Sequence, residues 1–168
     1  MSLKPIRRLG CFAAVVMVVG CGARSAIEVP LGPVAKEIQT RGYRPEKSFV
    51  KPPTEWEVAK FGMRDRVWVA FKAEQQLRSD EAPVGEHDKK YYCRFALIEE
   101  TYDSTADARR RLLQIHDEFP GGPGEDEYTR TLRDGFVVDR TLYVLQTDGS
   151  IFWPEVKRLI GSLAASRR

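Results

Sequence analysis

Apolar positions along the chain follow three different patterns, and each pattern predicts a different kind of structure. A continuous apolar run covers residues 11–19. Between residues 55 and 147, short stretches rich in β-branched and aromatic residues are bounded by turn residues, which is typical of strands. Two segments after residue 104 repeat apolar residues every three or four positions, as the buried face of a helix does.

The strand pattern predicts five strands. They are expected at residues 55–61, 66–73, 91–100, 128–138 and 140–147. The segment between the second and third strands is polar and contains Pro83 and Gly85, so a loop is expected over residues 77–90.

Each of the two helical segments begins with a start signal. Ser104 precedes the first and has an acid, Asp107, three residues on, which is the pattern of a helix N-cap. Pro154 opens the second, with Glu155 in its first turn. The expected apolar faces are Ala108, Leu112, Ile115 and Phe119 in the first helix, and Val156, Leu159, Ile160, Leu163 and Ala164 in the second.

The element order ββ-β-α-ββ-α predicts an α+β fold for a single domain over residues 55–168. An antiparallel sheet of about five strands with both amphipathic helices on one face buries both apolar stripes most simply. The open face of that sheet is then the expected contact surface. Residues 21–54 contain several prolines and few apolar residues, so a tether is expected there, with a short helix at residues 33–41.

The first apolar run belongs to a signal peptide that is expected to cover residues 1–20. Lys4, Arg7 and Arg8 precede the run, and no acid accompanies them, as in the positive region of an export signal. A helix that crosses a bilayer needs roughly 20 apolar residues, so the run at residues 11–19 is too short for a permanent span.

Val18-Val19-Gly20-Cys21 resembles the lipobox of bacterial lipoproteins. The resemblance implies that the Cys21 thiol receives a diacylglyceryl group and that cleavage leaves Cys21 as the new N-terminus. It also implies a lipoprotein that is anchored in the bacterial cell envelope and faces the periplasm. Gly22 stands where some bacteria have an Asp that retains lipoproteins in the inner membrane, which favours the outer membrane. Cleavage after Ala23, giving a secreted protein without lipid, is the alternative.

The charge of the chain argues against nucleic acid as a partner. The full sequence has 27 basic and 24 acidic residues, a formal charge of +3. Lys4, Arg7 and Arg8 account for this whole excess, so the chain after the signal is formally neutral. A nucleic-acid-binding protein needs an excess of one sign over a surface or segment.

No catalytic constellation, cofactor motif or metal motif is predicted. Cys93 is the only cysteine left if Cys11 departs with the signal and Cys21 is acylated, and it is expected to be a small buried hydrophobic residue. Glu99 and Glu100 are neighbours on a strand, so their side chains point to opposite faces and cannot act on one bond.

Two functions are compatible with these observations. The first is a non-enzymatic binding or structural module, held on the membrane through the lipid on Cys21 and in contact with an envelope protein. The second is a small periplasmic enzyme or ligand-binding domain with a His/carboxylate site. Its candidates are His87, between Glu86 and Asp88, and His116, beside Asp117.

Overall fold

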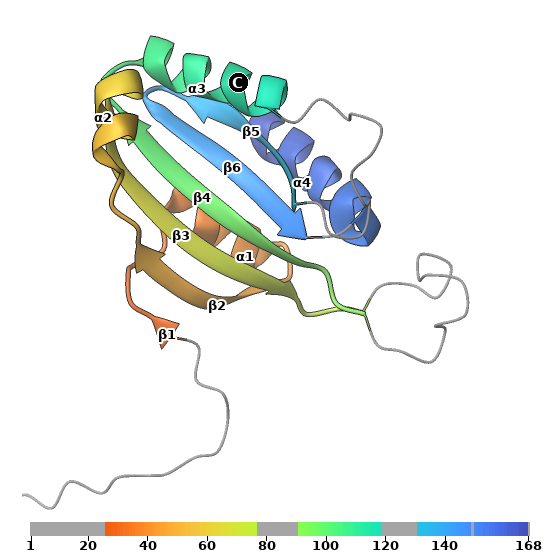
Figure 1. The fold of residues 1–168 in the computed structure, drawn as a ribbon. Coiled ribbons are helices and arrows are strands. Elements are labelled where there is room, and N and C mark those ends of the chain that lie inside the picture. The colour runs from red at the N-terminus through yellow and green to blue at the C-terminus, as the bar shows by residue number, and fades with distance from the viewer. Residues whose placement is uncertain (1–25, 77–90, 119–130, 149, 168) are drawn as a thin grey trace, which may run out of the picture.

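The computed structural model describes residues 26–76, 91–118, 131–148 and 150–167. Within these residues, Figure 1 shows one sheet with helices on both of its faces. The strands are β1 Ala26–Ile27, β2 Tyr43–Val50, β3 Met63–Ala73, β4 Arg94–Tyr102, β5 Thr131–Val138 and β6 Thr141–Asp148. The helices are α1 Pro33–Thr40, α2 Glu55–Phe61, α3 Thr105–Glu118 and α4 Trp153–Ala165, with a 3₁₀ turn, η2, over Ser150–Phe152.

The α+β class and the antiparallel sheet are confirmed. The strand order is β1-β2-β3-β4-β6-β5, and every pair from β2 to β5 is antiparallel. Only the two-residue strand β1 is parallel to its neighbour. Four of the five expected strands correspond to β3, β4, β5 and β6, and both expected helices after residue 104 are present as α3 and α4.

The strand expected at residues 55–61 is wrong, because this segment is helix α2. The reason is a capping box that the alternation of Trp56 and Val58 obscured. The Thr54 amide donates to Glu57 Oε2 at 2.8 Å, and the Glu57 amide donates back to Thr54 Oγ1 at 3.3 Å. Gly62 then ends the helix in the left-handed conformation, with φ of 66°.

The tether expected over residues 21–54 is also wrong for the part that the structure describes. Residues 26–54 contribute β1, α1 and β2 to the domain, and Val34, Ala35 and Ile38 of α1 are fully buried. The short helix expected at residues 33–41 is confirmed as α1, with Pro33 in its first turn. Prolines in this segment therefore mark element boundaries and a shift of strand register after Pro45, not a flexible chain.

The expectation that both amphipathic helices share one face of the sheet is wrong. Buried side chains form two clusters, and neighbouring residues on one strand belong to different clusters: Leu97 packs with α4 and Ile98 with α3. Helices α1 and α4 therefore cover one face, and α2 and α3 lie over the other (Figure 1). The central strand β4 is buried on both sides, as Phe95–Ile98 shows, and such a strand needs cover on each face.

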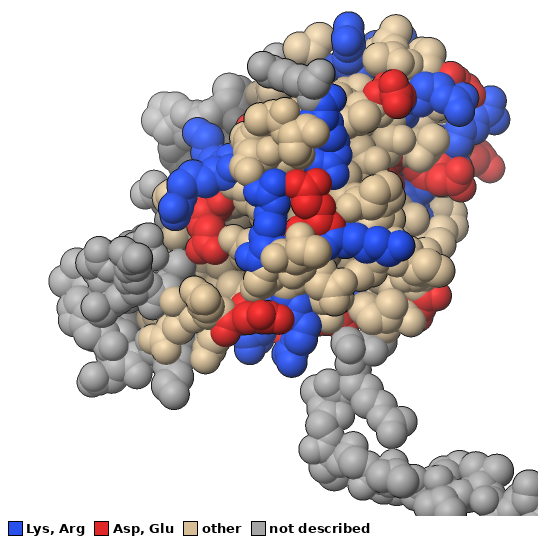
Figure 2. Space-filling model, turned by 180° about the vertical axis from the view of Figure 1, so that it is seen from behind, with Lys and Arg blue, Asp and Glu red and all other residues tan. Residues whose placement is uncertain are grey.

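On the α1/α4 face, charged side chains of both signs join the two helices. Glu37 of α1 accepts hydrogen bonds from Arg41 and, at 2.6 Å, from Arg167 beyond α4. The Arg41 hydrogen bond is the main reason that the pKa of Glu37 is lowered. Figure 2 shows this side of the molecule with acidic and basic residues next to one another and no broad region of a single sign.

Candidate functional site

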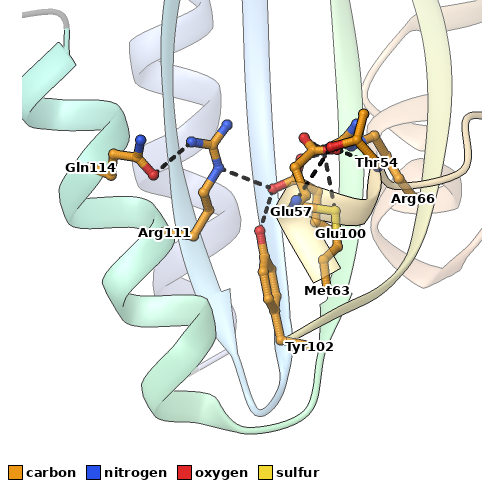
Figure 3. A network of polar contacts seen from close by, with 8 residues as sticks. All are labelled: Thr54, Glu57, Met63, Arg66, Glu100, Tyr102, Arg111 and Gln114. Carbon is orange, nitrogen blue, oxygen red and sulfur yellow. Dashed lines mark hydrogen bonds and ion pairs between the residues drawn. The ribbon is translucent and has the colours of Figure 1, made fainter. Parts of the chain in front are cut away.

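A buried ionic network lies between the sheet and the helices α2 and α3 (Figure 3). We use the term buried network for Glu57 of α2, Arg66 of β3, Glu100 and Tyr102 of β4 and Arg111 of α3. Arg66 is 7% exposed and Glu100 is 4% exposed, which is rare for charged residues unless they are paired. The network thus draws one charged group from each of the four elements that meet at this end of the sheet.

The geometry pairs the charges closely. Arg66 Nε donates to Glu100 Oε1 at 2.9 Å, and Arg66 Nη2 contacts Glu57 Oε1. The Tyr102 hydroxyl donates to Glu100 Oε2 at 2.6 Å, and Arg111 Nε lies 4.0 Å from the same oxygen. Both carboxylates are therefore bound by an arginine, as buried charges require.

The surroundings favour the charged forms of Glu57 and Arg66 and the neutral form of Tyr102. Partial burial raises the pKa of Glu57, but hydrogen bonds from Arg66 and Thr54 outweigh it and bring the pKa down to about 2. Burial lowers the pKa of Arg66, yet Glu57 and Glu100 raise it by more. Burial and the Glu100 charge both raise the pKa of Tyr102. At neutral pH Glu57 and Arg66 are therefore charged, and Tyr102 keeps its proton.

Above this network, a shallow groove runs between α2 and α3. Its lining residues are Lys60, Phe61, Thr105, Ala106, Arg109, Arg110, Leu113 and Gln114, and none of them is acidic. Leu113 is 63% exposed, and Trp56 is exposed beside the groove with Lys60 Nζ 4.5 Å from the centre of its ring. We call this surface the α2–α3 groove. Exposed apolar side chains with a polar rim are typical of sites that bind other proteins.

The buried network supports the walls of this groove. Glu57 ties α2 to Arg66 of the sheet, and Arg111 brings α3 close to Glu100 while its guanidinium lies 5.4 Å from the Phe61 ring. Phe61 itself is buried against α3 through the cluster that contains Ala108 and Ile115. The spacing of the two helices is therefore set by buried contacts, and the groove is a preformed feature.

Of the two histidines, the structure describes only His116, because His87 lies outside the described residues. His116 Nε2 is 2.8 Å from Asp134 Oδ1. The carboxylate partner of His116 therefore comes from β5, whereas the sequence pointed to its neighbour Asp117. Asp134 Oδ1 also accepts from the Gly135 amide at 2.7 Å. The pair is partly exposed and joins α3 to β5. Among the described residues, no group of three or more His, Cys, Asp or Glu is arranged to hold a metal ion.

Cys93, Glu99 and Glu100 lie as the sequence predicts. Cys93 is a free and buried cysteine, and burial, with the nearby Glu155, raises the pKa of its thiol to about 12. Glu100 joins the buried network, whereas Glu99 lies on the other face of the sheet, close to Gly32. Burial raises the pKa of Glu99, and Arg167 opposes this only in part. Within the described ranges, Glu99 Oε1 is buried without a hydrogen-bond partner.

The candidate lipidation residue Cys21 lies outside the described residues. No helix in the described part of the chain is long and apolar enough to cross a bilayer. Comparison with protein-family models, with curated proteins and with solved structures finds no match to this chain. The function is therefore argued from the residues and their geometry.

Sequence reasoning missed the buried network, although two signals for it are present. Arg66 and Glu100 each stand next to apolar residues on the same strand face, Trp68 and Ile98, and a charge at a buried strand position needs a partner. Thr54 and Glu57 have the spacing of a capping box. Neither signal reveals that the two charges lie side by side, because that depends on the β3–β4 register, which pairs Arg66 with Glu100.

Proposed function

We propose that this chain is a lipid-anchored protein of the bacterial envelope and that its domain is a non-enzymatic binding module. The anchor is Cys21, on the strength of Val18-Val19-Gly20-Cys21. The binding surface is the α2–α3 groove, and the observation that carries this assignment is its combination of exposed apolar side chains with cations and no acids.

The chemistry of the groove defines the partner that fits it. Leu113 and, beside the groove, Trp56 offer exposed apolar contact, and Lys60 and Arg109 offer positive charge along the rim, where Arg110 is already paired with Asp107. An amphipathic protein segment with apolar residues on one face and Asp or Glu beside them complements this surface. The partner that we propose is therefore an acidic amphipathic segment of another envelope protein.

One observation favours a second function, a small periplasmic enzyme that uses His116. The distance of 2.8 Å between His116 and Asp134 is that of a base held by a carboxylate. A base needs a nucleophile or substrate group within reach, and Cys93, the cysteine in the described part of the chain, is buried and cannot serve. A measurable activity that is lost in His116→Ala, and kept when other exposed residues are substituted, would favour this function over the binding module.

Intact mass spectrometry of the protein from its host tests the anchor. The expected mass exceeds that of residues 21–168 by a diacylglyceryl group or more, and Cys21→Ala removes this excess. Acylation of this kind keeps a protein on a bilayer, because two acyl chains bind firmly where one binds reversibly. An unmodified chain that begins at Arg24 would refute the anchor.

Site-specific photocrosslinking in cells tests the groove. A photoreactive residue in place of Leu113 is expected to capture one defined protein, and peptide mapping should place the crosslink in an acidic amphipathic segment. Lys60→Glu with Arg109→Glu should abolish the crosslink by charge repulsion. The same photoreactive residue at Lys157, an exposed position of α4, is the matched control. Recovery of only lipid or the same background at both positions would refute the assignment.

A further inference from the structure

The start of the described chain lies close to the proposed anchor. Ala26, where β1 begins, is only five positions after Cys21. A chain of this length spans at most about 17 Å even when fully extended. If Cys21 is acylated, as the proposed function holds, the domain cannot stand clear of the lipid headgroups. Some part of its surface next to β1 must face the bilayer.

The surface next to β1 has two exposed aliphatic side chains on the same face. Ile27 of β1 lies beside Ser48 of β2, and Val50 is two residues further along β2. Ile27 is 42% exposed and Val50 is 53% exposed. Since strand residues two apart point the same way, the two side chains form one small apolar patch at this edge of the sheet.

Two lysines flank the same edge from the opposite face of the sheet, because positions 47, 49 and 51 alternate with positions 48 and 50 along the chain. Lys47 and Lys51 are both exposed, and Lys47 Nζ lies 4.9 Å from the centre of the Phe49 ring. Glu46 is the nearest acid on β2, and Arg44 lies 3.8 Å from it. Glu28 follows Ile27 and is exposed. Lysine stems that lie along apolar surface with the ammonium outward match the boundary between acyl chains and phosphates.

We propose that this edge, which we call the β1–β2 edge, rests on the membrane. Ile27 and Val50 enter the headgroup region, and Lys47 and Lys51 contact the phosphates of anionic lipids. The inference rests on the proposed anchor, because the short chain between Cys21 and Ala26 is what brings this edge to the bilayer.

The proposed contact also orients the domain. The sheet has β1 at one edge and β5 at the other, and α3 packs chiefly on β5 (Figure 1). A domain that rests on the β1–β2 edge therefore holds α3 over the opposite edge of the sheet. Leu113 and the α3 side of the groove then face away from lipid, where a partner protein can reach them.

A thiol-attached environment-sensitive fluorophore tests the contact in the acylated full-length protein. Val50→Cys introduces an exposed thiol, while Cys93 is buried and Cys21 carries lipid, so labelling is confined to position 50. Vesicles contain phosphatidylethanolamine with a minority of phosphatidylglycerol. We expect the emission at position 50 to rise roughly threefold on reconstitution and to be quenched by nitroxides on the lipid acyl chains, because the label leaves water.

Labels at Leu113→Cys and Lys157→Cys are the matched controls, and the emission of both should remain that of a fluorophore in water. Lys47→Glu with Lys51→Glu should return the label at position 50 to water, as should vesicles of phosphatidylcholine alone. Lys36→Glu, an exposed lysine of α1, should have no effect. If mass spectrometry finds the acyl chains but position 50 stays water-like, this inference fails and the anchor stands. If the acyl chains are absent, the anchor and the inference fail together.

Discussion

Substitution of Glu100 by glutamine removes one charge from the centre of the buried network and keeps the shape of the side chain. Glu100 accepts from Arg66 at 2.9 Å and from Tyr102 at 2.6 Å, and Arg111 lies 4.0 Å away. In Glu100→Gln, Arg66 keeps a single charged partner, Glu57, and Arg111 loses its nearest carboxylate.

The size of the effect follows from burial. Loss of one partner from a buried ion pair costs about 3–5 kcal/mol when the remaining charge is left uncompensated. Glu57 still compensates Arg66, so we expect the lower end, about 3 kcal/mol. For a domain of this size, such a loss lowers the melting temperature by roughly 10 °C. Glu57→Gln combined with Glu100→Gln should cost more than the two single changes together, because Arg66 then has no carboxylate at all.

Urea unfolding followed by circular dichroism measures these free energies. Glu46→Gln is the matched control, since Glu46 and Arg44 form an exposed pair at 3.8 Å. An exposed pair contributes at most about 1 kcal/mol. The reasoning is refuted if Glu100→Gln changes the free energy of unfolding no more than Glu46→Gln does, or if the double variant at positions 57 and 100 is additive.

Three further predictions concern single titratable groups. The pKa of Glu57 is lowered from 4.5 to about 2, so above pH 4.5 this residue should contribute up to about 3 kcal/mol to the free energy of unfolding. This contribution should be lost as the pH falls towards 2. Urea unfolding of Glu57→Gln should lack this pH dependence. Glu99 has a raised pKa, so its burial favours the protonated form and destabilises the fold as pH rises above 4.5; Glu99→Gln should raise the unfolding free energy at pH 7 and have little effect at pH 4. Cys93, with a pKa raised to about 12, should react with a thiol reagent at pH 8 only after denaturant is added; rapid labelling of the native protein would contradict its burial.

The sequence predicted those elements whose local pattern agrees with their tertiary surroundings. The stripe of Val156, Leu159, Ile160 and Leu163 is buried in α4, and Ser104 precedes α3 with its hydroxyl accepting from the Asp107 amide at 3.1 Å. The sequence pattern gave the wrong prediction for α2, because Trp56 and Val58 alternate as in a strand but are both exposed. There the capping box of Thr54 and Glu57, not the apolar pattern, decides the structure.

The periodicity of the individual strands did not predict that helices cover both faces of the sheet. Phe95–Ile98 is a continuous apolar run, which signals burial on both sides, and this run was the available indication of a second helical layer. The role of β2 was missed for a different reason. Pro45 and the charged residues Arg44, Glu46 and Lys47 are typical of a loop, yet they suit a strand near the sheet edge.

The two proposed surfaces should respond separately to damage in the buried network. Glu57 and Arg111 position the walls of the α2–α3 groove, so Glu100→Gln should lower the photocrosslinking yield at position 113. The β1–β2 edge is held by backbone pairing with β3, from Val50 opposite Val67 to Tyr43 opposite Ala73, and does not depend on Glu100. A fluorophore at position 50 should therefore report the same lipid environment in Glu100→Gln as in the unaltered protein. If the two readouts fall together, the network supports the whole domain and not the groove in particular.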